Sequence, residues 1–395
     1  MVERKHPAIV LDLSANGIGI VRSLGRKGVD VYAFDTGKKY KIGKTCYATC
    51  KSCPDPIKDE DGLLTFLLNL GKTFCCKAVL YAGSDDFLYF MSKHREILSM
   101  YYLFLLPEHS TIHALIDKRL TYELATKYNI PCPTTFFLDQ EEELEDILNK
   151  LTFPCIIKPV YGHKFRQHIN KKIIMVHSAE ELKTVFPYYR QFGELMLQEF
   201  IPGDDSTFYK LATFLDEDMN VKALFTLQKI HQFPPNMGTG ALIISKRDEE
   251  IIDVGLPFLK ELECRGVAMA EFKKDPRDGE LKFIEINSRL WLSHSLTEAC
   301  GIDFAYLYYL YLTGQDPEPR LYQIEDIKWI YLVRYYLAYL QKREYGEMTF
   351  NDFKKGLSGN KQYALFAWDD PMPFLRSTFS HLYNSWKTKK QEENT

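Results

Sequence analysis

The stretch Lys282–Trp291, KFIEINSRLW, places Glu285, Asn287 and Arg289 at alternate positions inside an apolar run. In a β-strand, successive side chains point to opposite faces. These three polar groups would therefore share one face, and the intervening isoleucines would share the other. A strand with one apolar face and one polar face predicts a core on the first side and a site on the second.

A second alternating stretch, Val267–Lys273 (VAMAEFK), precedes the first and is separated from it by the sequence DPRDG. Asp, Pro and Gly favour tight turns, so the two strands are predicted to pair as an antiparallel hairpin. With the turn centred near Asp278, Glu271 lies opposite Glu285, with Cβ atoms roughly 5 Å apart. Two carboxylates at this separation repel each other unless a cation lies between them.

Glu271, Glu285 and Asn287 can offer oxygen atoms to such a cation. Oxygen ligands favour hard Mg²⁺ over zinc or copper, and Mg²⁺ usually completes its octahedron with waters and nucleotide phosphates. Arg289, on the same face, can reach a phosphate or carboxylate oxygen through its planar guanidinium group. The alternative is a solvent-facing strand with scattered charges. The predicted hairpin register favours the Mg²⁺ and phosphate site.

A site of this kind requires nucleotide-binding residues nearby, and the candidates lie upstream. Lys158 ends the apolar run 154–157, and Lys118 begins a predicted helix, so each can present an ammonium group to a phosphate. The stretch 197–205, LQEFIPGDD, combines a strand, whose edge can read adenine, with acids that can accept hydrogen bonds from ribose. Taken alone, each lysine would usually be a solvated side chain, and the alternative for the stretch is a strand that ends in a polar turn.

Length and composition bound the class of protein. A chain of 395 residues favours two or three domains over a single core. The formal net charge of -3 gives no reason to expect nucleic acid or a membrane as partner.

The N-terminus lacks the apolar run of a signal peptide, and nine cysteines without such a signal indicate reduced thiols in the cytoplasm. The segments FAYLYYLYL and WIYLVRYYLAYL are too short to span a bilayer, which takes roughly 20 residues, and are predicted to be buried helices.

Strands and helices alternate through about the first 110 residues, where AIVLDL, VDVYAFD and KAVLYAG are the predicted strands. This order predicts an α/β domain with a parallel sheet. Charged helices then separate strands in an α+β arrangement, and from about Gly203 strands dominate. Beyond about residue 320 the chain is aromatic and predicted to be helical, with a disordered polar tail, KTKKQEENT.

The sequence Asn16–Gly19, after the first predicted strand, is similar to a dinucleotide-binding turn, with Asp35 where a ribose-binding acid would stand. Arg22, however, occupies the position of the third glycine of that pattern. A tight turn that opens a helix is therefore the favoured interpretation, and a bound nucleotide cofactor is the alternative.

Cys46, Cys50 and Cys53 have the spacing of the iron–sulfur ligands of radical S-adenosylmethionine enzymes. Ser52 stands where those enzymes usually have an aromatic residue, and the strand–helix repeats of their barrel are not found later in the chain. The polar flanking sequences favour a surface loop over a cluster site.

Together, these residues resemble the ATP-grasp superfamily of carboxylate–amine ligases, over about residues 5–315. The most specific part is the ordered series IIKPV, LQEFIPGDD, AEFKKD and FIEINSR. Within the superfamily, the chain is most similar to the D-aspartate ligase and carbamoyl-phosphate-synthase-like group. The resemblance implies two α+β lobes that clasp ATP. The implied domains are an α/β Rossmann-like pre-ATP-grasp domain (1–110), a small lobe or lid (111–202), a large lobe with the metal site (203–320) and a helical C-terminal extension (321–395).

The resemblance also implies roles for individual residues. The implied cofactor-binding residues are Lys118 and Lys158 for the phosphates, Gln198, Glu199, Phe200 and Ile201 for adenine, and Asp205 for ribose. The implied ligands of Mg²⁺, or of Mn²⁺ in its place, are Glu271, Glu285 and Asn287. Arg289 would stabilise an acyl phosphate. Gln228 and His231 stand where arginines are usual in the family, and Lys229 would compensate for the missing charge. The loop 161–166, which would cover the phosphates, has fewer glycines than the family pattern.

The implied reaction transfers the γ-phosphoryl group of ATP to a substrate carboxylate. An amine then attacks the acyl phosphate, which gives an amide, ADP and phosphate. Such catalysis requires positioning and electrostatics rather than an enzyme nucleophile. Ser84–Asp86 is a candidate corner for binding the amine, and a helix N-cap is its alternative. The implied partners are ATP and small carboxylate and amine substrates, and a homodimer is a candidate assembly.

The sequence is also compatible with two other classes of function. The first is a binding module that uses ATP as a structural or regulatory ligand without turnover. The acids and lysines argue against this module, whereas Gln228 and His231 leave it open. The second is a radical enzyme built on the three cysteines, which iron–sulfur absorbance after anaerobic purification would reveal.

Overall fold

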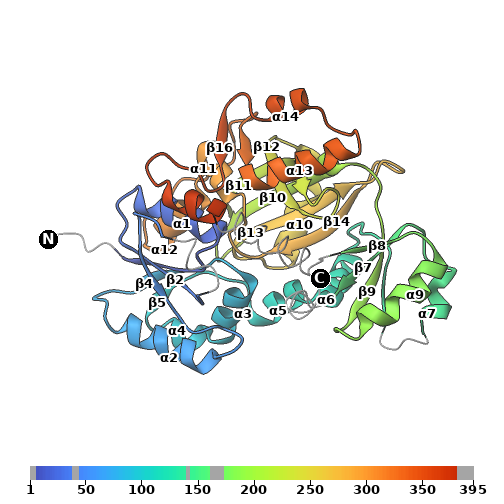
Figure 1. The fold of residues 1–395 in the computed structure, drawn as a ribbon. Helices are drawn as coiled ribbons and strands as arrows, with labels where there is room; N and C mark the ends of the chain where they lie inside the picture. Colours follow the sequence, from blue (N-terminus) through green and yellow to red (C-terminus); the bar gives the residue numbers. More distant parts are fainter. Residues whose placement is uncertain (1–5, 38–43, 139–142, 161–172, 380–395) are drawn as a thin grey trace, which may run out of the picture.

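The computed structural model describes residues 6–37, 44–138, 143–160 and 173–379, and the strands within these ranges form three sheets (Figure 1). The loop 161–166 and the tail KTKKQEENT, on which predictions were made above, lie outside the described residues. The three sheets follow one another along the chain, so each corresponds to one region of the sequence.

The first sheet is parallel, with five strands in the order β3-β2-β1-β4-β5. Ile9 and Leu11 of β1 pack with helices α2 and α3, whereas Ala8 and Val10 face α1 and the large lobe, as the alternation of a strand requires. The predicted α/β arrangement is therefore confirmed. Its elements are β1 (Ala8–Leu11), α1 (Ala15–Gly25), β2 (Val31–Asp35), β3 (Thr49–Ser52), α2 (Glu60–Gly71), β4 (Ala78–Ala82), α3 (Asp85–Lys93), α4 (Arg95–Leu98) and β5 (Tyr102–Leu103).

Two helices, α5 (His109–Ile116) and α6 (Lys118–Lys127), lead to an antiparallel sheet in the order β6-β9-β7-β8, which belongs to the small lobe. Helix α6 begins at Lys118, as predicted, because the Asp117 carboxylate accepts hydrogen bonds from the Arg119 and Leu120 backbone N–H groups. The elements of the small lobe are β6 (Thr135–Phe137), α7 (Glu143–Leu148), β7 (Cys155–Pro159), β8 (Ile174–Val176), α9 (Ala179–Arg190) and β9 (Leu195–Glu199).

The third sheet has the order β14-β13-β10-β11-β12-β15-β16 and belongs to the large lobe. The elements up to residue 320 are the 3₁₀ turn η1 (Asp205–Thr207), β10 (Phe208–Leu215), β11 (Val221–Phe233), β12 (Thr239–Ser245), α10 (Glu249–Glu261), β13 (Gly266–Lys274), β14 (Leu281–Asn287), α11 (His294–Ala299) and α12 (Phe304–Leu312). Helix α12 is the segment FAYLYYLYL, so the helix predicted there is confirmed.

The C-terminal extension adds strands to this sheet as well as helices. Its elements are β15 (Lys328–Ile330), α13 (Leu332–Glu344), α14 (Phe350–Gly356) and β16 (Lys361–Tyr363). The segment WIYLVRYYLAYL, predicted to be one helix, begins as β15 and continues as α13. Pairing of β15 with β12 fully buries Trp329, and this long-range contact decides the conformation of the first residues. Within the described ranges, no helix has the length and apolar character needed to cross a membrane.

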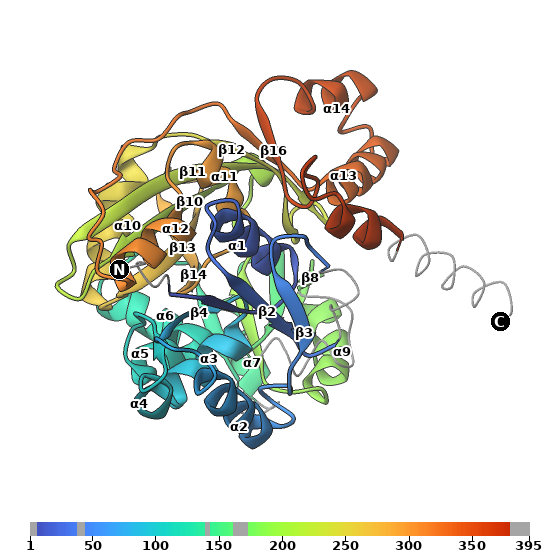
Figure 2. The same ribbon diagram turned by 90° about the vertical axis from the view of Figure 1, so that its left-hand side faces the viewer.

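The large lobe and the N-terminal domain share a core, in which α1 packs against α11 and α12 (Figure 2). The extension also reaches the N-terminal domain. Asp370 and Arg22 form an ion pair of 2.9 Å, and both side chains are buried. Asp370 also accepts from the Thr45 hydroxyl group. The extension is therefore attached to the large lobe through its strands and to α1 through this buried pair.

The glycines of Asn16–Gly19 serve this packing. A Cβ atom at Gly17 would lie 1.8 Å from the Asp12 carbonyl oxygen, and one at Gly19 would lie 2.6 Å from the His294 ring. The Asn16 amide donates to the carbonyl groups of Gly83 and Leu290. These glycines thus allow α1 to begin in a crowded corner, which agrees with the structural interpretation of the motif.

Candidate functional site

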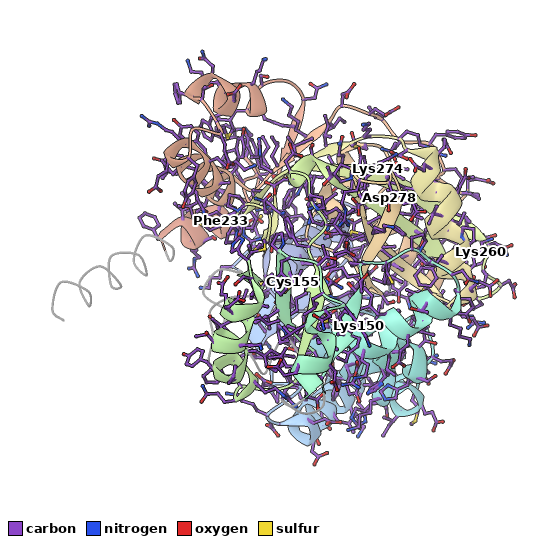
Figure 3. The ribbon with its side chains drawn as sticks, turned by 90° about the vertical axis from the view of Figure 1, so that its right-hand side faces the viewer. Lys150, Cys155, Phe233, Lys260, Lys274 and Asp278 are labelled. Carbon is purple, nitrogen blue, oxygen red and sulfur yellow. The ribbon has the colours of Figure 1, made fainter. Side chains whose placement is uncertain are left out.

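The predicted hairpin is present, and the predicted pair of Glu271 and Glu285 is found in it, with a shift of register between Glu271 and Phe272 that the sequence did not predict. Strands β13 and β14 are antiparallel, Glu271 pairs with Glu285, and Met269 pairs with Asn287. Figure 3 shows the hairpin, marked by Lys274 and Asp278, beside the small-lobe sheet, marked by Cys155. The site therefore lies where the two lobes meet.

Glu271 is buried, and both of its carboxylate oxygens contact lysines. Its Oε1 lies 2.6 Å from Lys229 Nζ, and its Oε2 lies 2.5 Å from Lys210 Nζ. Burial alone would raise the pKa of Glu271, but the two ammonium groups outweigh this effect and hold the pKa at about 2. A positive charge was expected beside the two glutamates, and at Glu271 the two lysines provide it.

Glu285 and Asn287 lie on the open side of the hairpin. The Glu285 side chain is exposed, and its Oε1 is 3.3 Å from the Asn287 amide nitrogen. Arg289 donates through Nε and Nη2 to the two oxygens of Asp85, at 2.7 and 3.1 Å, and through Nη2 to Asn287 Oδ1 at 3.1 Å. Asp85 begins α3 of the N-terminal domain. The predicted amine corner, Ser84–Asp86, therefore adjoins Arg289.

The two predicted phosphate lysines come together from different elements. Lys118 Nζ donates to the Pro159 carbonyl group at 2.8 Å, and Lys158 Nζ donates to Gln198 Oε1 at 2.7 Å. Burial, followed by the charge of Lys118, lowers the pKa of Lys158 to about 7. Glu285 and Glu271 also act on this lysine and oppose the shift. The structure thus brings the lysines of the small lobe close to the acids of the hairpin.

The predicted adenine hinge, residues 198–201, connects the small lobe to the large lobe. Gln198 is buried and donates to the Thr135 hydroxyl group, and Glu199 pairs with Arg277 at 2.6 Å. Lys273 Nζ donates to the Ile201 carbonyl group at 2.7 Å and lies over the Phe200 ring, 4.9 Å from its centroid. Lys273 follows Glu271 by two residues on β13, so both side chains lie on the same face of the strand. This strand therefore contacts both the hinge and the acidic pair, Glu271 and Glu285.

Asp205, predicted to bind ribose, is enclosed by protein donors. Its carboxylate accepts from the backbone N–H groups of Gln232 and Asn236 and from the Gln232 amide. Lys342 Nζ, from α13 of the C-terminal extension, lies 3.0 Å from Asp205 Oδ2. The side chain of Asp205 is fully buried, so this carboxylate fixes the surrounding backbone and has no exposed surface for a ribose hydroxyl group.

The two residues that replace family arginines have other contacts. Gln228 donates to the Ser206 carbonyl group at 2.7 Å and to the Tyr209 hydroxyl group at 3.1 Å. His231 stacks on Tyr335, with ring centroids 5.7 Å apart. Lys229 lies between them in the sequence, and its side chain points to Glu271. Of Gln228, Lys229 and His231, only Lys229 contacts the acidic pair in the described part of the chain.

The three spaced cysteines do not gather into a metal site. Cys46 is exposed and its thiol donates to the Asp369 carbonyl group, whereas Cys53 is buried in the N-terminal core among apolar side chains. Among the described residues, no group of three or more His, Cys, Asp or Glu side chains is arranged to hold a metal ion. The described residues therefore do not support an iron–sulfur cluster at these cysteines.

Sequence reasoning missed the residues Lys210, Lys273, Gln232 and Lys342. Lys210 and Lys273 could have been found, because each is a lysine inside a predicted strand, at a position that alternation places on the face of Glu271. Lys210 pairs directly with Glu271 across β10 and β13. No sequence pattern identifies Lys342, because its position in an aromatic segment does not predict a contact with Asp205.

Comparison with known proteins shows which families the chain is similar to. Residues 116–307 match the model of the RimK-like ATP-grasp domain. The chain is 29% identical to a D-aspartate ligase of Enterococcus faecium, over 58% of this chain and 57% of that protein. It is 24% identical to a D-alanine–D-alanine ligase of Francisella tularensis, over 48% of this chain and 64% of that protein. The chain thus spans less than two thirds of the length of either relative.

Solved structures share the fold at low sequence identity. The L-amino acid ligase from Bacillus licheniformis superposes with a TM-score of 0.60 at 19% identity, over 79% of this chain and 75% of that one. The biotin carboxylase domain of the 2-oxoglutarate carboxylase from Hydrogenobacter thermophilus, solved with MgADP, gives a TM-score of 0.64 at 17% identity, over 82% and 73%. Residues 116–307 of this chain therefore form a RimK-like ATP-grasp domain.

Proposed function

We propose that this protein is an ATP-dependent ligase that joins a carboxylate to an amine and releases ADP and phosphate. The observation that carries the proposal is the junction of the lobes, where Lys118 and Lys158 approach the hairpin of Glu271 and Glu285. With Lys210 and Lys229, four lysines meet two glutamates there, and this excess of positive charge favours a polyanion such as a triphosphate. The relatives named as ligases support the same reaction class.

The side chains at the hairpin fit one divalent cation. Glu285 presents an exposed carboxylate, and Asn287 would add its Oδ1, which accepts from Arg289 Nη2 in this structure, so the oxygen ligands suit Mg²⁺ or Mn²⁺. Glu271 would join them once Lys210 turns from its carboxylate toward the phosphates, while Lys229 stays beside it. When bound, the metal ion would offset the negative charge of the phosphates.

The residues of the chain would then act by position and charge. Lys118 and Lys158 would hold the phosphates, and residues 198–201 would bind the adenine. Lys229 would face the transferred phosphoryl group, and Arg289 the carboxylate that receives it. Phosphoryl transfer gives an acyl phosphate and ADP. The amine nitrogen then forms a bond to the acyl carbon, phosphate leaves, and the amine loses a proton.

Phosphate release from MgATP against a panel of carboxylic acids and amines tests the proposal. Hydroxylamine would trap an acyl phosphate as a hydroxamate. A substrate pair that gives phosphate and amide in equal amounts supports the ligase. If MgATP binds and no pair releases phosphate, the protein is instead a binding module without turnover.

The low pKa of Lys158 predicts proton uptake on nucleotide binding. In the free protein this pKa is about 7, so at pH 8 the amine is mostly neutral. A bound polyanion favours the ammonium form, so MgADP binding at pH 8 should take up about one proton, and its affinity should fall as the pH rises above 7. Calorimetry in two buffers of different ionisation enthalpy measures this uptake.

The variant Lys158→Arg keeps its charge and should bind MgADP without this proton uptake. Lys150→Arg is the matched control, because Lys150 is an exposed lysine of the same lobe, and it should behave as the unchanged protein does. A binding enthalpy that is the same in both buffers at pH 8 would contradict the role given to Lys158.

We also propose the cytoplasm as the compartment and a homodimer as the assembly. All nine cysteines are free thiols, which favours a reducing compartment. One structural neighbour is described as a dimer. Cell fractionation and light scattering of the purified protein test these two statements.

A further inference from the structure

A lysine of the C-terminal extension reaches the interior of the large lobe. Lys342 lies on α13, which packs on β11 (Figure 1), and only 7% of this residue is exposed. Its Nζ lies 3.0 Å from Asp205 Oδ2 and 3.3 Å from His231 Nδ1. A buried ammonium group therefore has one anionic partner and one imidazole partner, both on the large lobe.

From Asp205, hydrogen bonds continue to the acidic pair without a break. Asp205 Oδ1 accepts from Gln232 Nε2 at 2.8 Å, Gln232 Oε1 accepts from Lys229 Nζ at 3.3 Å, and Lys229 Nζ contacts Glu271 Oε1 at 2.6 Å. These four residues are all buried. In a buried network, each group fixes the orientation of the next, because an unsatisfied member is costly.

The orientation of each group in this network follows from its partners. An ammonium group can only donate, so His231 Nδ1 accepts from Lys342 and Gln232 Oε1 accepts from Lys229. Burial, followed by the charge of Lys342, lowers the pKa of His231 to about 4, which leaves the imidazole neutral. A neutral ring supplies the acceptor that Lys342 requires. Asp205 and His231 together therefore hold the ammonium group in one place.

Anchoring of the extension does not depend on Lys342. Strand β15 pairs with β12, and Tyr335 and Tyr339 of α13 are buried with Leu242. The buried pair of Arg22 and Asp370 attaches the far end. Since these contacts hold the extension, the position of a buried charge against Asp205 calls for another explanation.

We propose that Lys342 is a positioning residue for the reaction. Through Asp205 and Gln232, it fixes the ammonium group of Lys229 beside Glu271, so the C-terminal extension completes the centre that handles the phosphoryl group. This inference rests on the proposed function, because Lys229 has a role only if phosphoryl transfer occurs there. Lys342 acts through its contacts with Asp205 and His231 and is not proposed to bind substrate or nucleotide.

The variant Lys342→Met removes the charge and keeps the length of the side chain. We expect it to lower kcat for phosphate release by roughly tenfold to a hundredfold, because a small displacement of Lys229 is sufficient for such a loss. The dissociation constant for MgADP should change by less than about threefold. Lys342→Arg should recover most of kcat. Arg343→Met, at the exposed neighbouring position, is the matched control and should leave kcat unchanged.

The pathway through Gln232 is tested by a double variant. If Lys342 acts through Gln232, then Lys342→Met added to Gln232→Leu should lower kcat no further than Gln232→Leu alone. Losses that multiply would overturn the pathway, and a kcat of Lys342→Met within twofold of the unchanged protein would overturn the proposal. Circular dichroism melting gives the folded fraction by which each kcat is corrected. If Lys342→Met does not fold, Lys342→Gln, whose amide can still donate to Asp205, takes its place.

A second measurement separates this inference from the proposed function. The side-chain resonance of Lys229, assigned in ¹³C-lysine-labelled protein by its loss in Lys229→Arg, reports the surroundings of that ammonium group without turnover. It should shift in Lys342→Met and return in Lys342→Arg. If the unchanged protein releases no phosphate, the proposed function fails. An unshifted Lys229 resonance overturns the role of Lys342 in either case.

Discussion

Glu285→Gln is expected to lower Mg²⁺-dependent phosphate release by roughly two to three orders of magnitude and to leave the protein folded. The glutamine keeps the shape of the side chain but removes the negative charge that a divalent cation requires. The Glu285 side chain is exposed and its contact with Asn287 is 3.3 Å long, so the fold depends little on this charge. Initial rates over a Mg²⁺ titration measure the effect.

The matched control for this change is Glu280→Gln. Glu280 is an exposed acid at the turn of the same hairpin and pairs only with nearby Lys282 among the described contacts. Its loss should leave phosphate release within twofold of the unchanged protein. If Glu285→Gln also stayed within this range at every Mg²⁺ concentration, the metal ligands proposed for the hairpin would be wrong.

Glu271→Gln is expected to affect both stability and turnover. Glu271 is the buried partner of Lys210 and Lys229, and removal of its charge leaves one half-buried and one buried ammonium group without their anion. Removal of one partner from a buried ion pair typically lowers the free energy of unfolding by about 3–5 kcal/mol. Urea unfolding measures this loss, and phosphate release should fall below detection because Lys229 is no longer held.

The pH dependence of this loss provides a further check. The pKa of Glu271 is about 2 in the folded protein and 4.5 without its partners. Its contribution to stability is therefore complete above pH 4.5 and disappears as the pH falls toward 2. The difference in unfolding free energy between Glu271→Gln and the unchanged protein should shrink over the same range.

A double variant identifies the cause of the destabilisation. If the two unpaired ammonium groups are responsible, Lys210→Met added to Glu271→Gln should restore part of the stability. Glu280→Gln again serves as the control, since an exposed pair contributes at most about 1 kcal/mol. A Glu271→Gln variant as stable as the unchanged protein would show that the buried pairs do not stabilise the fold.

The N-terminal domain shows which features the local sequence pattern can predict and which it cannot. Its alternation of strands and helices predicted a parallel sheet, and the side chains of β1 divide between two cores as period two requires. The glycines of Asn16–Gly19 suggested two interpretations, which pattern alone could not separate. The choice depended on Asp12 and His294, which lie close to them only in the folded chain.

The C-terminal extension shows where local pattern fails. The segment WIYLVRYYLAYL is aromatic throughout, so its sequence carries no clear period and suits a strand or a helix. Its first residues became β15 because β12 offers an open edge, and the rest became α13. Lys342 could not be recognised from sequence for the same reason, because its partner Asp205 lies on another element far along the chain.

The sequence by itself determined the hairpin, the pairing of Glu271 with Glu285 and the polar face of Glu285, Asn287 and Arg289, because strand alternation and turn chemistry act between near neighbours. Only the tertiary structure decided what these groups contact. Lysines from β10 and β11 surround Glu271, and α13 encloses Asp205. Charges buried between distant elements have partners that depend on packing, and no local period encodes that packing.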